Sequence, residues 1–115
     1  MSTGGQILFG ALNATVGALG VGISPGSIYQ NGTTATITTP SVLAMGVGGT
    51  APYTYAWTKV SGAAINIGSA ATAVTNFNAA TMVSPSDRIA TFRVTVTDAT
   101  LATSTSDIIV ECERF

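Results

Sequence analysis

Two glutamates near the C-terminus, Glu111 and Glu113, are the residues of this chain best spaced for acid–base chemistry. Residues two apart on a β-strand project from one face about 7 Å apart. Two carboxylates at such a separation can hydrolyse a glycosidic bond. The pair lies at the very end of the chain, however, with no groove predicted around it. Carboxylates also protect an exposed final strand, and we favour that interpretation.

Other groups that usually carry out catalysis are missing from the sequence. The chain has no histidine and therefore lacks the usual general base and the usual zinc ligand. Its single cysteine, Cys112, has no histidine to activate it and no second cysteine for a disulfide within the chain. We interpret it as a small buried hydrophobic residue. We therefore expect no enzyme activity and no cofactor.

A calcium site is the second chemistry to consider. Asp98 and Asp107 flank the last predicted turn and would approach each other if the final two strands pair. Calcium takes about six to eight oxygen ligands, so two carboxylates are too few without several carbonyls and waters. Aspartate is also a common turn residue that hydrogen-bonds its own backbone. We favour the turn interpretation and predict no metal site.

The composition indicates a neutral surface. Apolar residues make up 46% of the chain and charged residues 8%, the net charge is −1, and nineteen threonines and ten serines supply most of the polarity. A net charge near zero favours association, so both a Thr-rich secreted β domain and a protein covered by other subunits fit. The basic residues are scattered, which gives no stripe for phosphates and no expected nucleic-acid partner. They are Lys59, Arg88, Arg93 and Arg114.

At 115 residues the chain is long enough for one domain. Residues 7–23 are apolar, but no basic residue precedes them, and Asn13, Thr15 and several glycines interrupt them, so we expect neither a signal peptide nor a membrane span. We predict a Gly-rich N-terminal arm over residues 1–15 and a folded domain over residues 16–115. The predicted partner-binding anchors are apolar residues of the arm and of the other terminus: Ile7, Leu8, Phe9, Leu12 and Phe115.

From about Val16 onward, apolar and polar residues alternate as in β-strands. Turn signals around Pro25 and Gly32 bound a first strand near residues 21–23 and a second beginning at Thr33. Pro40 should bend that second strand or force a bulge. After Pro40, the odd-numbered positions 43, 45 and 47 resume an apolar face.

The later strands have the clearest alternation. Residues 53–57 place three aromatic side chains on one face, which would bury about 150–250 Å² each if turned inward. The run "ATFRVTVTD", residues 90–98, is the strongest strand pattern. About seven short strands and no long helical pattern favour a β-sandwich. We predict the following core residues: Tyr53, Tyr55, Trp57, Phe92, Val94 and Val96.

Two separated motifs carry a family resemblance. The runs "GGTAPYTYAWTKVSGAAINI" and "ATFRVTVTDA" resemble immunoglobulin-like domains of the polycystic-kidney-disease (PKD) type and their bacterial and phage relatives. The resemblance covers roughly residues 24–113 and implies an all-β, Ig-like sandwich. Many family members follow the tryptophan with an Asp-Phe-Gly-Asp-Gly turn, where this chain has "TKVSG". A calcium or carbohydrate role tied to that turn is therefore not carried over.

Short chains with one Ig-like domain, a Gly-rich arm and little charge also resemble virion proteins of tailed bacteriophages. That resemblance implies a capsid decoration protein, located in the virion, whose partners are the major capsid protein, other virion subunits or further copies of itself, and not a membrane. A tail-associated protein is the near alternative. A secreted or cell-surface adhesion module that binds glycans is another; it would require exposed aromatics, for which Tyr29 and Phe115 are candidates.

Overall fold

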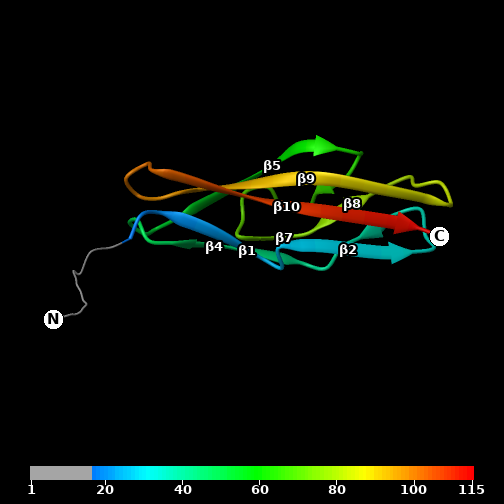
Figure 1. Ribbon diagram of the computed structural model, residues 1–115, viewed down its shortest axis with the longest axis horizontal. Coiled ribbons are helices and arrows are strands. Elements are labelled where there is room, and N and C mark those ends of the chain that lie inside the picture. The colour runs from blue at the N-terminus through cyan, green and yellow to red at the C-terminus, as the bar shows by residue number, and fades with distance from the viewer. Residues whose placement is uncertain (1–16) are drawn as a thin grey trace.

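The computed structural model describes residues 17–115, so the predicted arm lies outside the described residues. This part of the chain forms ten β-strands and contains no helix that could span a membrane (Figure 1). The strands are β1 Gly20–Ser24, β2 Ser27–Gly32, β3 Ile37–Thr38, β4 Val42–Val47, β5 Thr54–Gly62, β6 Asn66–Ile67, β7 Val74–Thr75, β8 Phe77–Ala79, β9 Ser86–Thr97 and β10 Thr103–Arg114.

One layer is a four-stranded sheet in the order β2-β10-β9-β5. Strands β9 and β10 pair antiparallel from Thr97 opposite Thr103 to Ser86 opposite Arg114. From Ala90 to Thr97 of β9 and from Ile108 to Cys112 of β10, buried positions alternate with exposed or half-buried ones, as expected for a sheet buried on one face. β5 pairs antiparallel with β9, and β2 pairs parallel with β10.

The other layer is divided into two short sheets, β1-β4-β7 and β3-β8-β6. Pro40 separates β3 from β4, because proline has no N–H for a ladder hydrogen bond. Thr39 bridges the break: its N–H donates to the Phe77 carbonyl oxygen (2.8 Å), and its Oγ1 accepts from the Phe77 N–H (3.0 Å). The residues described here thus form more strands than the seven or so expected, since the segments of this layer are interrupted.

The expected turn at Gly32 and the strand beginning at Thr33 are wrong. β2 continues through Gly32, which pairs with Arg114 of β10, and residues 33–36 form the turn instead. The Phe115 N–H donates to the Gly32 carbonyl oxygen (2.9 Å) and extends that pairing. This parallel pairing joins residues about eighty positions apart, so local turn signals do not reveal it.

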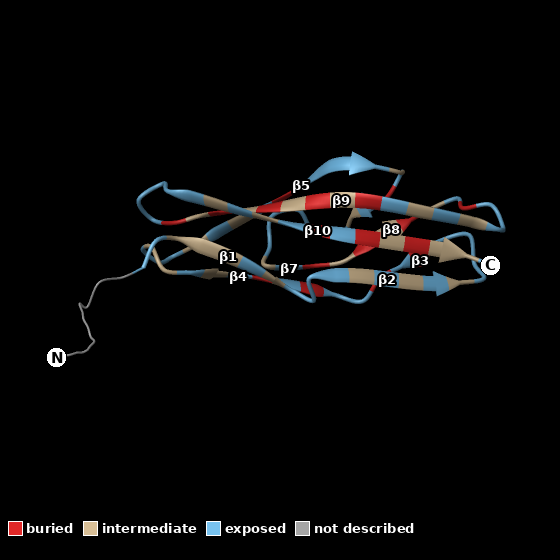
Figure 2. Ribbon diagram, viewed as in Figure 1, coloured by how far each residue is buried: buried red, intermediate tan, exposed pale blue. Residues whose placement is uncertain are grey.

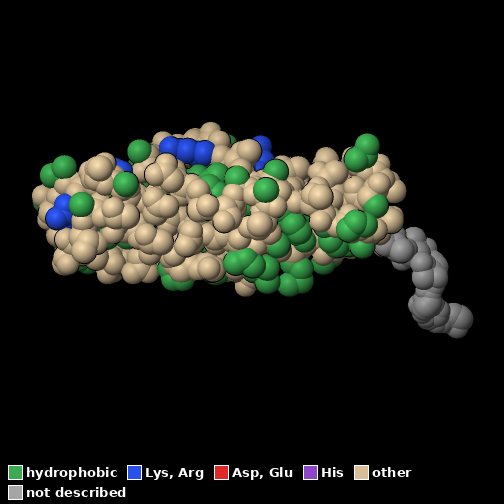
Figure 3. Space-filling model, turned by 180° about the vertical axis from the view of Figure 1, so that it is seen from behind, with side chains coloured by type: hydrophobic (Ala, Val, Ile, Leu, Met, Phe, Trp, Pro, Cys, Tyr) green, Lys and Arg blue, Asp and Glu red, His purple; other side chains and the backbone are tan. Residues whose placement is uncertain are grey.

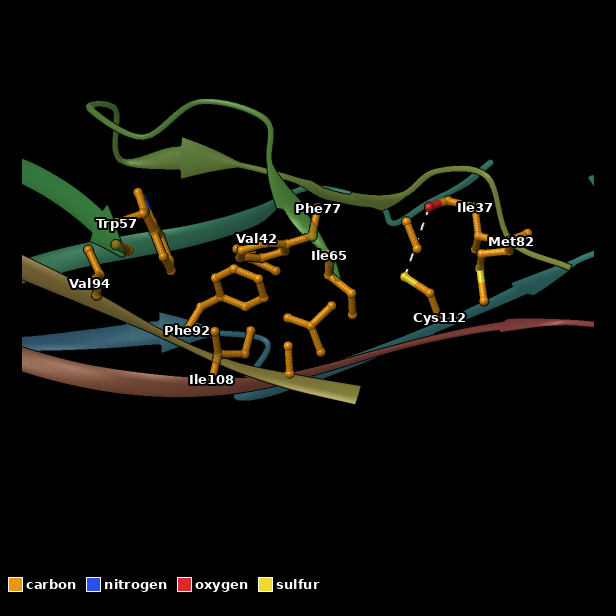
Figure 4. Close-up of a cluster of buried hydrophobic side chains, with 14 residues drawn as sticks. Ile37, Val42, Trp57, Ile65, Phe77, Met82, Phe92, Val94, Ile108 and Cys112 are labelled. Carbon is orange, nitrogen blue, oxygen red and sulfur yellow. Dashed lines mark hydrogen bonds between the residues drawn. The ribbon is translucent and has the colours of Figure 1, made fainter. Parts of the chain in front are cut away.

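The hydrophobic core fills the space between the two layers (Figures 2 and 4). Phe77, from β8, connects them, since its ring centroid lies 4.6 Å from that of Phe92 and 5.9 Å from that of Trp57, edge to face with the latter. The Trp57 Nε1–H donates to the Thr72 carbonyl oxygen (2.8 Å), which satisfies the one polar atom of the buried indole.

The predicted core residues lie on the inward side of their strands. Phe92, Val94 and Val96 are fully buried, and Trp57 is 3% exposed. Tyr53 and Tyr55 are half-buried, and both hydroxyls meet backbone near β4. The Tyr53 hydroxyl donates to the Gly48 carbonyl oxygen (2.5 Å), and the Tyr55 hydroxyl accepts from the Gly46 N–H (3.0 Å). The three aromatic side chains of residues 53–57 therefore belong to the interior and its margin.

Candidate interaction surface

The apolar face at positions 43, 45 and 47 of β4 points away from the core. The buried residues of β4 are Val42 and Ala44, each 1% exposed, whereas Leu43, Met45 and Val47 are 38%, 54% and 54% exposed. Tyr53 helps to explain which face of β4 points inward, because a Cβ at the inward Gly46 would lie 3.0 Å from the Tyr53 ring. A side chain larger than glycine at position 46 would therefore crowd that ring, which favours the inward placement of the even-numbered positions of β4.

Strand β1 lies beside these side chains and presents small residues on the same outer face. Leu43 is paired with Ser24, Met45 with Gly22 and Val47 with Gly20. Directly opposed residues of an antiparallel pair share a face, so a ridge of aliphatic side chains runs beside a row of small residues. The ridge and the row line a groove of about 510 Å³.

Figure 3 shows hydrophobic side chains gathered along the lower border of the molecule, where Figure 1 places the β1-β4-β7 sheet. Val74 of β7, 50% exposed, pairs with Leu43 and extends the apolar surface to the third strand. None of the three strands contains an Asp, Glu, Lys or Arg residue. This outer face is therefore a contiguous, uncharged apolar surface of the kind that marks a contact site.

One end of the groove adjoins the first described residues. The Gly49 N–H donates to the Gly17 carbonyl oxygen (3.0 Å), which fixes the chain before β1 against the turn that follows Val47. Gly48 and Gly49 have φ of 66° and 59°, and a Cβ at Gly48 would lie 2.4 Å from the Ala18 carbonyl oxygen. Glycine is required there both for the backbone conformation and for the close approach.

Asp98 organises the turn between β9 and β10. Its carboxylate accepts hydrogen bonds from the Thr100 hydroxyl (2.7 Å), from the backbone N–H groups of Thr100 (2.9 Å) and Ala102 (3.0 Å), and from the Thr50 N–H (3.0 Å). The Thr100 hydroxyl contributes most to lowering the pKa of Asp98, with the three backbone donors adding to it. Asp98 thus joins the β9–β10 turn to the β4–β5 turn.

Asp107 does not approach Asp98. It lies four residues beyond Thr103, which pairs with Thr97, and forms an ion pair with Arg93 (Nε to Oδ1, 2.8 Å). The hydrogen bond from Arg93 lowers the pKa of Asp107. The two aspartates that sequence reasoning considered for calcium therefore have separate roles in the structure, one in a turn and one in an exposed ion pair.

Glu111 and Glu113 share the outer face of the four-stranded sheet with a third acid, Asp87. Ligand oxygens of these three residues lie within 4.8 Å of one another. Asp87 stands opposite Glu113 in the β9–β10 pair, and only that register brings it to the site. The hydrogen bond with Asp87 raises the pKa of Glu111. If each carboxylate binds through one oxygen, the three supply only three of the about six to eight oxygens that calcium takes. The Tyr29 hydroxyl also donates to Glu113 Oε1 (2.5 Å).

The remaining predicted residues are dispersed. Cys112 is fully buried, and burial raises the pKa of its thiol. Phe115 is 57% exposed and lies at the end of the molecule opposite the start of β1 (Figure 1). The anchors Ile7, Leu8, Phe9 and Leu12 lie outside the described residues. Sequence reasoning missed the groove, although the alternation of small and large residues in "GVGIS" is its local signal.

Comparison with known proteins shows the fold. No family model and no curated protein matches the chain. Among solved structures, the PKD domain of human KIAA0319 superimposes with a TM-score of 0.50 at 19% identity, covering 87% of this chain and 85% of that one. A nucleoside hydrolase-related hypothetical protein from Saccharophagus degradans, associated with carbohydrate metabolism, gives a TM-score of 0.56 at 12% identity, covering 87% of this chain but only 26% of that chain.

The described residues thus form a PKD-like, Ig-like β-sandwich. At these identities the likeness extends to the fold and not to activity, because Ig-like folds carry many unrelated functions.

Proposed function

We propose that this chain is a non-catalytic structural protein of a bacteriophage virion that decorates the capsid by binding its surface. The observation that carries the proposal is the contiguous exposed apolar surface on the β1-β4-β7 sheet. Its outer face bears Leu43, Met45, Val47 and Val74, which are 38%, 54%, 54% and 50% exposed and adjoin one another. A subunit docked on a larger assembly buries a contiguous apolar face of this kind.

Phe115 supports the same proposal. Its backbone is held by the hydrogen bond to Gly32, while 57% of the residue remains exposed. An aromatic side chain presented from a fixed backbone loses little conformational entropy when a partner covers it. With the apolar residues of the N-terminal arm, Phe115 would provide anchors for a capsid subunit.

Sedimentation with capsids that lack the protein tests this proposal. We expect the full chain to bind saturably and in fixed stoichiometry. A variant in which Ile7, Leu8, Phe9 and Leu12 are replaced by serine should bind at least about tenfold more weakly, since each buried aliphatic or aromatic side chain contributes roughly 1.5–3 kcal/mol. Leu101→Ser, which changes an 81% exposed leucine in the β9–β10 turn, is the control for a general change in surface hydrophobicity.

If the full chain does not sediment with capsids, the decoration proposal is wrong. Sedimentation with purified tails and binding to polysaccharide would then discriminate the tail-associated and adhesion alternatives. Saturable binding of the monomer to a polysaccharide would favour the adhesion module.

A further inference from the structure

The groove on the outer face of the β1-β4-β7 sheet runs along two paired strands, a shape that suits the binding of an extended chain. Gly20, Gly22 and Ser24 form its low side, and the aliphatic side chains of β4 form its ridge. A Cβ at Gly22 would meet no atom within 4 Å, so the middle of the groove is open. Large side chains two residues apart on an extended segment would lie over the small residues and against the ridge.

The segment that precedes β1 carries side chains at this spacing. Ile7 and Phe9 are two residues apart, and Ala11 follows at the same interval. Five extended residues span about 13 Å from first to last Cα, which equals the span of Leu43 to Val47 on β4. With Phe9 over Gly22, Ile7 would lie near Ser24 and Leu43, and the small Ala11 would lie near Gly20 and Val47.

The path of the chain fits this arrangement. Gly17 is held beside Gly49, at the Val47 end of the groove. If residues 7–11 run toward that end, residues 12–16 connect them to Gly17 and reverse the chain direction. Five residues are enough for such a connection, since hairpin loops are usually two to five residues long.

We propose that residues 7–11 of the same chain dock in this groove, with Phe9 over Gly22. The size of the groove favours the chain's own segment over a second copy. Stable interfaces between proteins bury about 1,200–2,000 Å², far more than a five-residue segment provides. A tethered segment needs less area, because its effective concentration is roughly millimolar. A capsid partner would then compete with the groove for the same side chains.

Disulfide trapping in the full-length chain tests the placement. We expect the double variant Phe9→Cys, Gly22→Cys to form an intramolecular disulfide under mild oxidation, at a rate independent of protein concentration. The matched control, Phe9→Cys with Ile109→Cys, places the second thiol on the exposed outer face of the other layer. It should cross-link at least about tenfold more slowly. The buried Cys112 is present in both proteins and affects them equally.

Non-reducing electrophoresis and the mass of the product separate the outcomes. A monomer with two fewer free thiols supports docking within the chain. A disulfide-linked dimer that forms faster at higher protein concentration would overturn it in favour of a second copy. Cross-linking no faster than the control, together with equal chymotrypsin cleavage in the Gly22→Val test below, which keeps Phe9, would show that the segment does not occupy the groove.

Filling the groove gives a second test. Gly22→Val adds side-chain atoms where a Cβ meets nothing and should expel Phe9, so that chymotrypsin cleaves after Phe9 at least about fivefold faster than in the unmodified protein. Gly26→Val, at an equally open glycine outside the groove, should leave the cleavage rate unchanged. Equal cleavage in all three proteins would contradict docking. Neither experiment contains capsids, so docking without capsid binding would refute only the decoration proposal.

Discussion

Both outer faces of the sandwich expose aliphatic side chains, but the residues next to those side chains differ between the two faces. On the four-stranded sheet, Ile89 is paired with Glu111, and Ile109 lies between charged positions of β10. On the β1-β4-β7 sheet, the exposed Leu43, Met45 and Val47 adjoin one another and are opposed only by glycine and serine. Isolated exposed aliphatics are ordinary surface, whereas contiguous ones indicate a contact.

The largest expected effect is the difference in stability loss between replacing a buried methionine and replacing an exposed one. Met82 is 1% exposed and Met45 is 54% exposed. Met82→Ala should lower the free energy of unfolding by about 2–5 kcal/mol, because it leaves a cavity in the core. Met45→Ala should lower it by less than about 1 kcal/mol, as at most surface positions. Denaturant unfolding of both variants checks this, and equal losses would mean that Met45 is as buried as Met82.

The next effect concerns the turns where the two layers meet. Asp98→Asn removes the charge that four hydrogen bonds stabilise, and should lower the thermal midpoint at neutral pH by several degrees. Because the folded-state pKa of Asp98 is lowered, its stabilisation is complete above the ordinary carboxyl pKa and is lost as pH falls through the folded-state value.

Thermal melts from neutral to acidic pH check this prediction. The difference between the unmodified protein and Asp98→Asn should shrink as the pH falls through the acidic range. Thr100→Val removes the hydroxyl donor but leaves the backbone donors, and should give only part of the loss. A difference that stays constant across the titration would assign the loss to packing and not to the charge of Asp98.

Sequence reasoning predicted a β-sandwich because its strongest signals are local, and the family resemblance supplied the Ig-like type. In "ATFRVTVTD" the alternation is unambiguous, since one face is apolar and the other is threonine and arginine. In "VLAMGV" both faces are apolar, so alternation defines the two faces but not which of them is buried. Which face of β4 is buried depends on Tyr53 and Tyr55, which come from another segment and contact Gly46.

The surface features depend on contacts between distant segments, which explains why they were missed. The groove requires β1 to pair with β4 in one register, and Asp87 joins the two glutamates only through the β9–β10 register. A shift of one residue in either pair would move these side chains to the opposite face. Composition predicted that part of the surface would be uncharged, and the pairing of the strands determines where that part lies.

The smallest expected effect lies on the charged face, within the cluster of Asp87, Glu111 and Glu113. The raised folded-state pKa of Glu111 means that the folded protein holds this proton more tightly than the unfolded chain does. Its contribution is therefore fully present below the ordinary glutamate pKa and is lost as pH rises through the folded-state value. Glu111→Gln removes this titration and should raise the thermal midpoint at neutral pH by a few degrees at most, with little change in acid.

Asp107→Asn, on the same strand, is the matched comparison because it removes the same charge. The Arg93 ion pair lowers the pKa of Asp107, so this variant should lose stability at neutral pH where Glu111→Gln gains it. Opposite shifts in the two thermal melts would show that the local partners of each carboxylate decide the sign. Shifts in the same direction would instead indicate that net charge dominates the effect on stability. The clustered Glu111 and the ion-paired Asp107 would then not differ in the sign of their contributions.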